Sequence, residues 1–242
     1  MIEARRLAKQ FGTVAVLEDV SFQVPNGRIT TLLGGNGTGK TTILRTLTGL
    51  LRPTSGVVHV DGVDVWSTGR AARRRMGVVS DHFGLYPYLT AREHLRLAGA
   101  LRGLRGDALE TATTRAEEAL GIAPFARTHG RHLSQGQAMR VAVARAIVGD
   151  PENIVMDEPT RGLDVFGVRL LRQLLFALRD QGKAVLLTNH ALAEIEDLSD
   201  QLLVLARGCI VANGSITELL AASGKSTLEA CVVSLAQQED VR

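Results

Sequence analysis

The glycine-rich segment Gly34-Gly35-Asn36-Gly37-Thr38-Gly39-Lys40-Thr41 constrains the fold more than any other part of the sequence. It fits the pattern G-x-x-x-x-G-K-[ST], follows the apolar run Arg28–Leu33, and precedes a helical segment that extends to Leu50. In such a unit the glycines let backbone N–H groups turn inward around phosphate oxygens, and the helix N-terminus adds a favourable dipole. The segment therefore predicts a phosphate-binding loop between a buried strand and a helix; the alternative is an ordinary glycine-rich turn.

Two side chains at the end of this loop have specific expected roles. Lys40 is expected to reach the β- and γ-phosphates of a nucleotide, and the Thr41 hydroxyl to bind Mg²⁺. A similar string at Gly224-Lys225-Ser226 lacks the first glycine, because position 219 is Leu, and no strand precedes it. The residues Ser226-Thr227-Leu228-Glu229 instead fit a helix-capping box.

A second feature is an apolar strand that ends in two adjacent carboxylates, Ile154-Val155-Met156-Asp157-Glu158. Because Mg²⁺ prefers hard oxygen ligands, Asp157 suits a metal ligand, directly or through water. Glu158 is one residue further on and points elsewhere, so it can polarise an attacking water. Such a strand end is common by itself, but beside a phosphate loop it predicts a site for phosphoryl transfer.

A third feature, Leu133-Ser134-Gln135-Gly136-Gln137, lies at the start of a helical segment at 135–148. A small hydroxyl and a glycine at a helix N-terminus again present N–H donors to an anion. The chain thus has two anion-binding helix starts and one expected type of nucleotide. One economical arrangement is that the second start serves a nucleotide held by another copy; the alternative is a plain serine N-cap.

The order of elements predicts an α/β fold. Strand-like and helical runs alternate, which favours a central, mainly parallel sheet flanked by helices. Residues 2–24 and 57–65 have the pattern of short strands, with a hairpin turn at Asp61-Gly62, and predict an N-terminal antiparallel β subdomain. Residues from 90 to about 150 have helical patterns and no intervening strand, which predicts an inserted helical lobe that opens on a capping box at Thr90.

Composition narrows the class of protein. Hydrophobic residues make up 45% and charged residues 22% of the 242 residues, a balance typical of a folded domain. The two cysteines, Cys209 and Cys231, cannot form a disulfide framework and suit a reducing compartment. The sequence contains no run of about 18 consecutive apolar residues, so it predicts no membrane-spanning helix. The net charge of +3 gives no footprint for nucleic acid, which is not an expected partner.

Together these motifs resemble those of the nucleotide-binding subunit of an ATP-binding-cassette (ABC) transporter, a phosphate-loop NTPase. The resemblance implies an ATPase domain at residues 1–222 and leaves 223–242 as a C-terminal tail helix. It implies a Walker A loop at Gly34–Thr42, a Walker B strand at Ile154–Glu158, and the signature motif at Leu133–Gln137. It also implies a D-loop at Gly162-Leu163-Asp164, a switch histidine at His190, and an adenine-stacking aromatic at Phe11. The alternatives are a core position for Phe11 and a plain surface position for His190.

The resemblance further implies ligands and partners. ATP and Mg²⁺ are expected between two nucleotide-binding subunits, in a homodimer or heterodimer, with Walker A of one copy facing the signature motif of the other. A separate transmembrane permease subunit is expected, with this chain at the cytoplasmic face of the membrane. The implied catalytic residues are Lys40, Glu158 and His190, and the implied metal ligands are Thr41, Asp157 and Asp81. The implied nucleotide contacts are Phe11, Gly34, Gly35, Asn36, Gly37, Thr38, Gly39, Lys40, Thr41, Thr42, Ser134, Gly136, Gln137 and Asp164.

One position departs from the family pattern. The family has a glutamine after the strand Gly77-Val78-Val79-Ser80, where this chain has Asp81. A carboxylate is still a hard oxygen ligand, but it adds negative charge near the γ-phosphate. Asp81 beside Phe83-Gly84-Leu85-Tyr86, with Asn153-Ile154 and Gly162–Val165, is similar to the bacterial subunits of sodium-extruding exporters.

The sequence thus predicts an ATP-hydrolysing motor subunit that powers export, with sodium ion as a candidate cargo. One alternative is a soluble ABC-type ATPase of DNA repair or translation, although such proteins usually carry two cassettes or a long coiled-coil insertion. Another is a non-hydrolysing regulatory module, which the intact Lys40, Asp157, Glu158 and His190 disfavour. Kinases and small GTPases share the phosphate loop but lack the Leu-Ser-x-Gly-Gln helix start.

Overall fold

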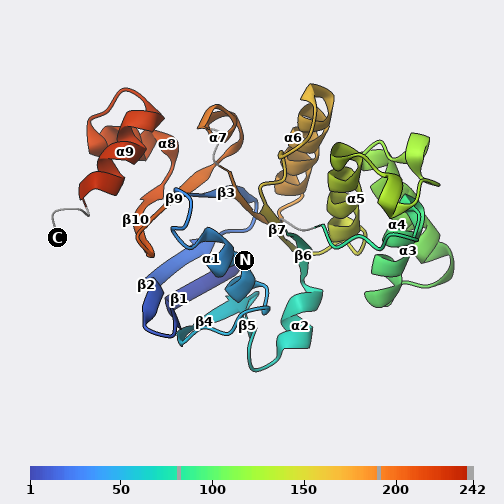
Figure 1. Cartoon of the computed structure of the whole chain (residues 1–242), viewed down its shortest axis with the longest axis horizontal. Coiled ribbons are helices and arrows are strands. Elements are labelled where there is room, and N and C mark those ends of the chain that lie inside the picture. Colours follow the sequence, from blue (N-terminus) through green and yellow to red (C-terminus); the bar gives the residue numbers. More distant parts are fainter. Residues whose placement is uncertain (81–82, 190–191, 239–242) are drawn as a thin grey trace.

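The computed structural model describes residues 1–80, 83–189 and 192–238 (Figure 1). Its strands are β1 (Ile2–Phe11), β2 (Val14–Val24), β3 (Arg28–Leu33), β4 (Ser55–Val60), β5 (Val63–Asp64), β6 (Met76–Val79), β7 (Asn153–Asp157), β8 (Ala184–Thr188), β9 (Gln201–Ala206) and β10 (Cys209–Gly214). Its α-helices are α1 (Lys40–Leu47), α2 (Gly69–Arg74), α3 (Ala91–Leu101), α4 (Gly106–Ala119), α5 (Gln135–Ile147), α6 (Val165–Asp180), α7 (Leu192–Leu198), α8 (Ile216–Ser223) and α9 (Leu228–Gln238).

Two sheets organise these elements. The larger sheet has the order β10-β9-β3-β8-β7-β6, and it is parallel throughout except for the β9–β10 hairpin at its edge. The smaller sheet has the order β2-β1-β4-β5 and is antiparallel. The central strands β7 and β8 are buried along their whole length, as parallel strands covered on both faces are. The expected mainly parallel sheet and antiparallel β subdomain are therefore confirmed.

The helices α3, α4 and α5 form a lobe at one end of the molecule, far from α8 and α9 (Figure 1). Helix α3 begins with the expected capping box, in which the Glu93 N–H donates to Thr90 Oγ1 and the Glu93 carboxylate accepts from the Thr90 N–H at 2.7 Å. Arg92 joins α3 to α4 through ion pairs with Glu110 and Glu117. Buried apolar residues from all three helices share one core with the large sheet. The helical lobe predicted from the sequence is thus present.

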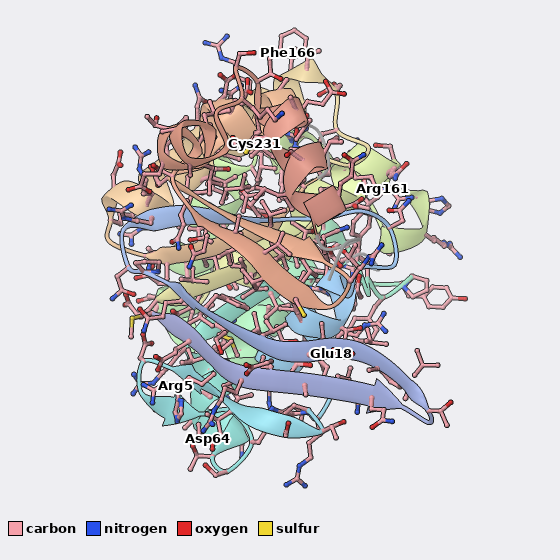
Figure 2. The ribbon with its side chains drawn as sticks, turned by 90° about the vertical axis from the view of Figure 1, so that its left-hand side faces the viewer. Arg5, Glu18, Asp64, Arg161, Phe166 and Cys231 are labelled. Atoms are coloured by element: carbon pink, nitrogen blue, oxygen red, sulfur yellow. The ribbon has the colours of Figure 1, made fainter. Side chains whose placement is uncertain are left out.

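The C-terminal helices α8 and α9 pack on the β9–β10 edge of the large sheet. Leu219, Leu228 and Cys231 are buried there in a separate apolar cluster, and Figure 2 shows Cys231 among these helices. The prediction that Ser226 caps the last helix is wrong by one residue. The Ala230 N–H donates to Thr227 Oγ1 and the Cys231 N–H to the Thr227 carbonyl, so the first turn closes on Thr227.

Among the helices of the described ranges, none by itself combines the length and the apolar composition that a membrane span requires. The pair α8 and α9 reaches such a length and composition only when the two are taken together, across a bend of 61°.

Candidate nucleotide site

The glycine-rich loop leaves the carboxyl end of β3 and returns into α1. A Cβ atom on Gly34 would lie 2.6 Å from the Leu205 carbonyl oxygen, so no side chain fits where the loop begins. Gly39, where the loop ends, has φ +107°, and a Cβ there would lie 2.7 Å from Leu17 Cδ2. The first and last glycines of the motif are therefore required by the close approach of β9 and β2.

Helix α1 begins at Gly39 with no side-chain cap, as far as the described residues show. Helices α2 and α4 also start without a side-chain cap, whereas side chains cap α3, α5, α6 and α8. The first turn of a helix has N–H groups without intrahelical partners, and a favourable dipole adds to their attraction for anions. The start of α1 thus fits a phosphate group, as the motif predicts.

Lys40 lies between the loop and two carboxylates. Its Nζ donates hydrogen bonds to the carbonyls of Gly34 at 2.6 Å and Gly35 at 2.9 Å, which draws the loop around the ammonium group. Burial lowers the pKa of Lys40, and the negative charges of Glu158 and Asp157 oppose this shift. A cation so placed faces both the loop and the carboxylate strand.

The two carboxylates lie at the end of β7, beside the end of β8. Asp157 is almost fully buried at 7% exposure, and its strand register pairs it with Thr188. The Thr188 hydroxyl donates to Asp157 Oδ1 at 2.6 Å and accepts from the Glu158 N–H at 2.9 Å. Glu158 has φ +46°, a conformation that residues other than glycine rarely adopt. The Thr188 hydroxyl thus holds the Asp157 carboxylate, and the left-handed backbone and the bond of its N–H to Thr188 hold Glu158.

The loop, the start of α1 and the carboxylates surround one cavity of about 230 Å³. Its lining residues are Val16, Asn36, Gly37, Gly39, Lys40, Thr41, Thr42, Asp157 and Glu158. A second cavity of about 200 Å³ shares Thr41 and Asp157 with the first. The structure therefore brings most of the predicted phosphate-loop residues together with both predicted carboxylates.

The donor set suits Mg²⁺. The Thr41 hydroxyl and the Asp157 carboxylate are hard oxygen donors that line the same two cavities. In the part of the chain that the structure describes, no group of three or more His, Cys, Asp or Glu side chains could hold a metal alone. Mg²⁺ in nucleotide sites typically takes one or two protein oxygens and completes its shell with phosphates and water. Thr41 and Asp157 therefore fit a metal that arrives with a nucleotide.

The signature segment lies at the start of α5, in the helical lobe. Ser134 Oγ accepts from the Gln137 N–H at 3.2 Å, and the Gln137 side chain accepts from the Ser134 N–H at 3.0 Å. A Cβ on Gly136 would lie 3.1 Å from the Gly162 carbonyl oxygen, so this helix start packs tightly on the D-loop. Among the described residues, none of the signature segment lines the phosphate-loop cavity, and Figure 1 shows α5 well apart from α1.

The remaining predicted residues occupy varied positions. Phe11 ends β1 and is 48% exposed, so the alternative of a core position is wrong; Lys9 Nζ lies 4.9 Å from its ring centroid. Asp164 is the N-cap of α6, where its Oδ1 accepts from the Gly167 N–H at 2.7 Å. Asp81 and His190 lie outside the residues that the structure describes, so their predicted roles stay predictions.

Three residues of the site were not assigned from sequence. Val16 lines the cavity from the antiparallel sheet, a contact between distant segments that no local pattern indicates. Arg161 forms a long ion pair with Glu158, at 3.9 Å between Nη1 and Oε2. Thr188 has no role in the sequence motifs above, although a hydroxyl at the end of the strand after the carboxylate strand is a usable indication.

Known proteins resemble this chain over most of its length. The family model described as "ABC transporter" matches residues 17–161. The chain is 40% identical to the Nod factor export ATP-binding protein I of Bradyrhizobium diazoefficiens, over 88% of this chain and 69% of that protein. It is 32% identical to the ABC transporter ATP-binding protein NatA of Bacillus subtilis, over 89% of this chain and 88% of that protein. The chain belongs to the ABC transporter family.

Solved structures of ABC proteins share the fold. The chain superposes on an ATP-binding subunit of an ABC transporter with a TM-score of 0.92, at 28% identity, over 97% of this chain and 99% of that one. It superposes on a dimeric post-hydrolysis state of an ATP-binding cassette bound to ADP and Pi with a TM-score of 0.79, at 25% identity, over 89% and 99% of the two chains. The chain therefore has the cassette fold of this family, of which one solved structure is bound to ADP and Pi.

Proposed function

We propose that this chain is the ATP-hydrolysing motor subunit of an ABC exporter. The observation that carries the proposal is the single cavity lined by Lys40, Thr41, Asp157 and Glu158 at the uncapped start of α1. Phosphate binding needs the loop, Lys40 and the helix start, and hydrolysis additionally needs a carboxylate that handles water. The same cavity offers both.

Each side chain then has a role in the reaction. The loop N–H groups and Lys40 bind the β- and γ-phosphates and neutralise the charge that develops on them. Thr41 and Asp157 would hold Mg²⁺, which supplies Lewis-acid stabilisation of phosphate oxygens when it is bound. Glu158 orients the attacking water in line with the bond that breaks. His190 is proposed to steady the γ-phosphate, and Asp81 to act near the metal.

A second subunit would complete the nucleotide-binding site. Among the described residues, none of the signature segment lines the phosphate cavity. Ser134 and Gly136 nevertheless lie at the start of α5, where the helix dipole favours an anion even though Ser134 Oγ accepts the Gln137 N–H. In a head-to-tail dimer, Ser134, Gly136 and Gln137 of one subunit would face the triphosphate bound by the other, with Asp164 and Phe11 near the same nucleotide. Hydrolysis would remove this shared anion and let the dimer open.

A separate membrane subunit would dock on a groove of about 510 Å³ between α2, β6, α3 and α5. Exposed apolar residues line it, with Leu50 at 70% and Leu101 at 74% exposure, beside the exposed arginines Arg70, Arg73 and Arg74. The groove shares Thr48, Leu50 and Val78 with the second cavity, which Thr41 and Asp157 also line. Co-purification of a hydrophobic subunit from membranes in mild detergent, weakened by Arg73→Glu with Arg74→Glu, tests this partner.

The membrane subunit would select the transported cargo, since the site described on this chain is for nucleotide. The relatives named for Nod factor export support export as the direction of transport. Sodium ion stays a candidate cargo on the sequence resemblance alone. The relatives are named for transport, so the soluble DNA-repair or translation ATPase is not favoured.

The hydrolysis proposal is tested by Mg²⁺-dependent phosphate release from ATP, with Lys40→Ala as the matched variant. The wild-type chain is expected to turn over ATP, and Lys40→Ala to lose at least about tenfold in ATP affinity, because one charge-assisted contact to phosphate is gone. No phosphate release by the wild-type chain at any protein concentration would contradict the proposal, as would unchanged ATP affinity in the variant.

A further inference from the structure

We propose that Thr188 is a positioning residue for hydrolysis, whose hydroxyl fixes both the carboxylate of Asp157 and the backbone of Glu158. The inference rests on the function proposed above, because it assigns those two residues to metal binding and to water activation. Thr188 itself lines neither of the two cavities that Asp157 borders, so it acts through its neighbours.

The contact is fixed by the sheet. Strands β7 and β8 are parallel neighbours, and their register places Thr188 opposite Asp157. Thr188 is fully buried, and the Asp157 carboxylate is nearly so. Solvent therefore has little access to replace the hydroxyl, and the two side chains are held together by the backbone pairing of their strands.

The hydroxyl bonds in two directions at once. A hydroxyl has one proton to donate and lone pairs to accept. Thr188 Oγ1 gives its proton to Asp157 Oδ1 at 2.6 Å and accepts the Glu158 N–H at 2.9 Å. Because each bond uses a different capacity of the same oxygen, both form together.

The accepted bond bears on the conformation of Glu158. With φ +46°, Glu158 is in the left-handed region that side-chain-bearing residues rarely adopt, and such strain persists when surrounding contacts hold it. The bond from its N–H to Thr188 is one of those contacts. Without it, the Glu158 backbone is free to relax, and the side chain that lines the phosphate cavity would change direction. The Thr188 hydroxyl thus fixes the positions of both the metal ligand Asp157 and the water-activating Glu158.

The decisive variants are Thr188→Val, which keeps the branched shape and removes the hydroxyl, and Thr188→Ser, which keeps the hydroxyl. The matched control is Thr30→Val on β3, another fully buried strand threonine. Its hydroxyl donates to Gln201 Oε1 at 3.2 Å, and Thr30 lines neither of the two cavities. In the full chain, Mn²⁺ binding with a non-hydrolysable ATP analogue is followed by electron paramagnetic resonance. For each variant we would also measure ATP binding in EDTA, the unfolding temperature, and kcat as a function of Mg²⁺ concentration.

Removing a partner that orients a metal ligand typically costs 10–100-fold in metal affinity or activity. Thr188→Val is expected to weaken Mn²⁺ binding about tenfold and to lower kcat about tenfold, which is about 1.4 kcal/mol of activation free energy. ATP binding in EDTA is expected to be unchanged, since no loop contact is altered. Thr188→Ser is expected to restore metal affinity and kcat to within about threefold of the wild type, and Thr30→Val to leave both unchanged.

Several outcomes overturn the assignment. Wild-type metal affinity and kcat in Thr188→Val would do so, as would a Thr188→Ser variant no better than the valine. If Thr188→Val also loses ATP binding in EDTA and unfolds at a lower temperature than Thr30→Val, Thr188 is structural only. A wild-type chain that releases no phosphate would instead overturn the proposed function, whereas normal wild-type hydrolysis with an indifferent Thr188→Val would overturn only this inference.

Discussion

At the scale of single residues, the site depends on groups whose neighbours set their direction and charge. Lys40, Asp157 and Glu158 are close in space because three strand ends meet at one edge of a parallel sheet. Their residue types and spacing from the glycine-rich loop could be predicted from the sequence. The left-handed backbone of Glu158 and its bond to Thr188 could not, because they depend on the register between β7 and β8.

Glu158→Gln separates binding from hydrolysis. The amide keeps the size of the side chain but loses the charge that orients and activates water, so kcat is expected to fall at least about 100-fold, which is the lower range for general-base catalysis. ATP affinity is expected to stay within about threefold, because Lys40 and the loop still bind phosphate. Phosphate release and equilibrium ATP binding measure the two effects; hydrolysis at the wild-type rate would remove Glu158 from its assigned role.

At the scale of elements, the sequence predicts strands and helices well where local patterns are strong. The Thr90 capping box opens α3 as expected, and Ser134 caps α5 with a reciprocal bond from Gln137. The N-cap of α9 is Thr227 and not the predicted Ser226. Either of these two adjacent hydroxyl residues could cap the helix, and only packing decides between them. The contact of Val16 with the nucleotide cavity also arises from packing, here between the two sheets.

Gly39→Ala tests the junction between the loop and α1. Its φ of +107° and the 2.7 Å approach of a Cβ to Leu17 Cδ2 make any side chain costly. We expect a loss of about 1–3 kcal/mol in unfolding free energy, together with weakened ATP binding. Gly35→Ala is the matched control, because a Cβ there meets only Thr38 Cγ2, at an ordinary 3.7 Å. Denaturant unfolding compares the two; equal stability losses would show that the junction has no special demand for glycine.

Helix α3 carries a buried histidine that links stability to pH. His94 Nδ1 is 2.8 Å from the Thr90 carbonyl, and Nε2 accepts the Tyr86 N–H at 2.7 Å, an arrangement that requires the neutral ring. Burial lowers the pKa of His94 and the Arg145 charge lowers it further, while the Thr90 carbonyl and the Glu93 carboxylate oppose the shift.

Because the folded-state pKa of His94 lies below its unfolded value of about 6.5, its stabilising effect is present above that pH and is lost as the pH falls through the folded pKa. His94→Asn keeps a hydrogen-bonding side chain without a titrating group. The wild type is therefore expected to lose more unfolding free energy than His94→Asn between pH 7.5 and pH 5.5. Chemical denaturation at both pH values measures the difference; parallel losses would exclude His94 as the cause.

At the scale of the whole molecule, one chain holds two helix starts suited to anions, and they lie apart. The uncapped start of α1 borders the phosphate cavity, whereas the start of α5 belongs to the helical lobe (Figure 1). Beyond the D-loop, Val165 and Phe166 are 83% and 81% exposed, and Figure 2 shows Phe166 at the outer edge of the molecule. The family and its α/β fold could be predicted from the motifs and their order. The assembly could only be proposed, because it depends on surfaces of two subunits.

The most direct test of the account is ATP-driven dimerisation, measured by sedimentation velocity on Glu158→Gln with and without Mg²⁺-ATP. The second variant adds Ser134→Asp, which keeps a good N-cap for α5 but places a negative charge where the partner's triphosphate would bind. The account predicts a nucleotide-dependent dimer for Glu158→Gln and a monomer for the double variant, with equal ATP affinity in both monomers. A Glu158→Gln chain that binds Mg²⁺-ATP and stays monomeric at every concentration, or a double variant that dimerises equally well, would contradict it.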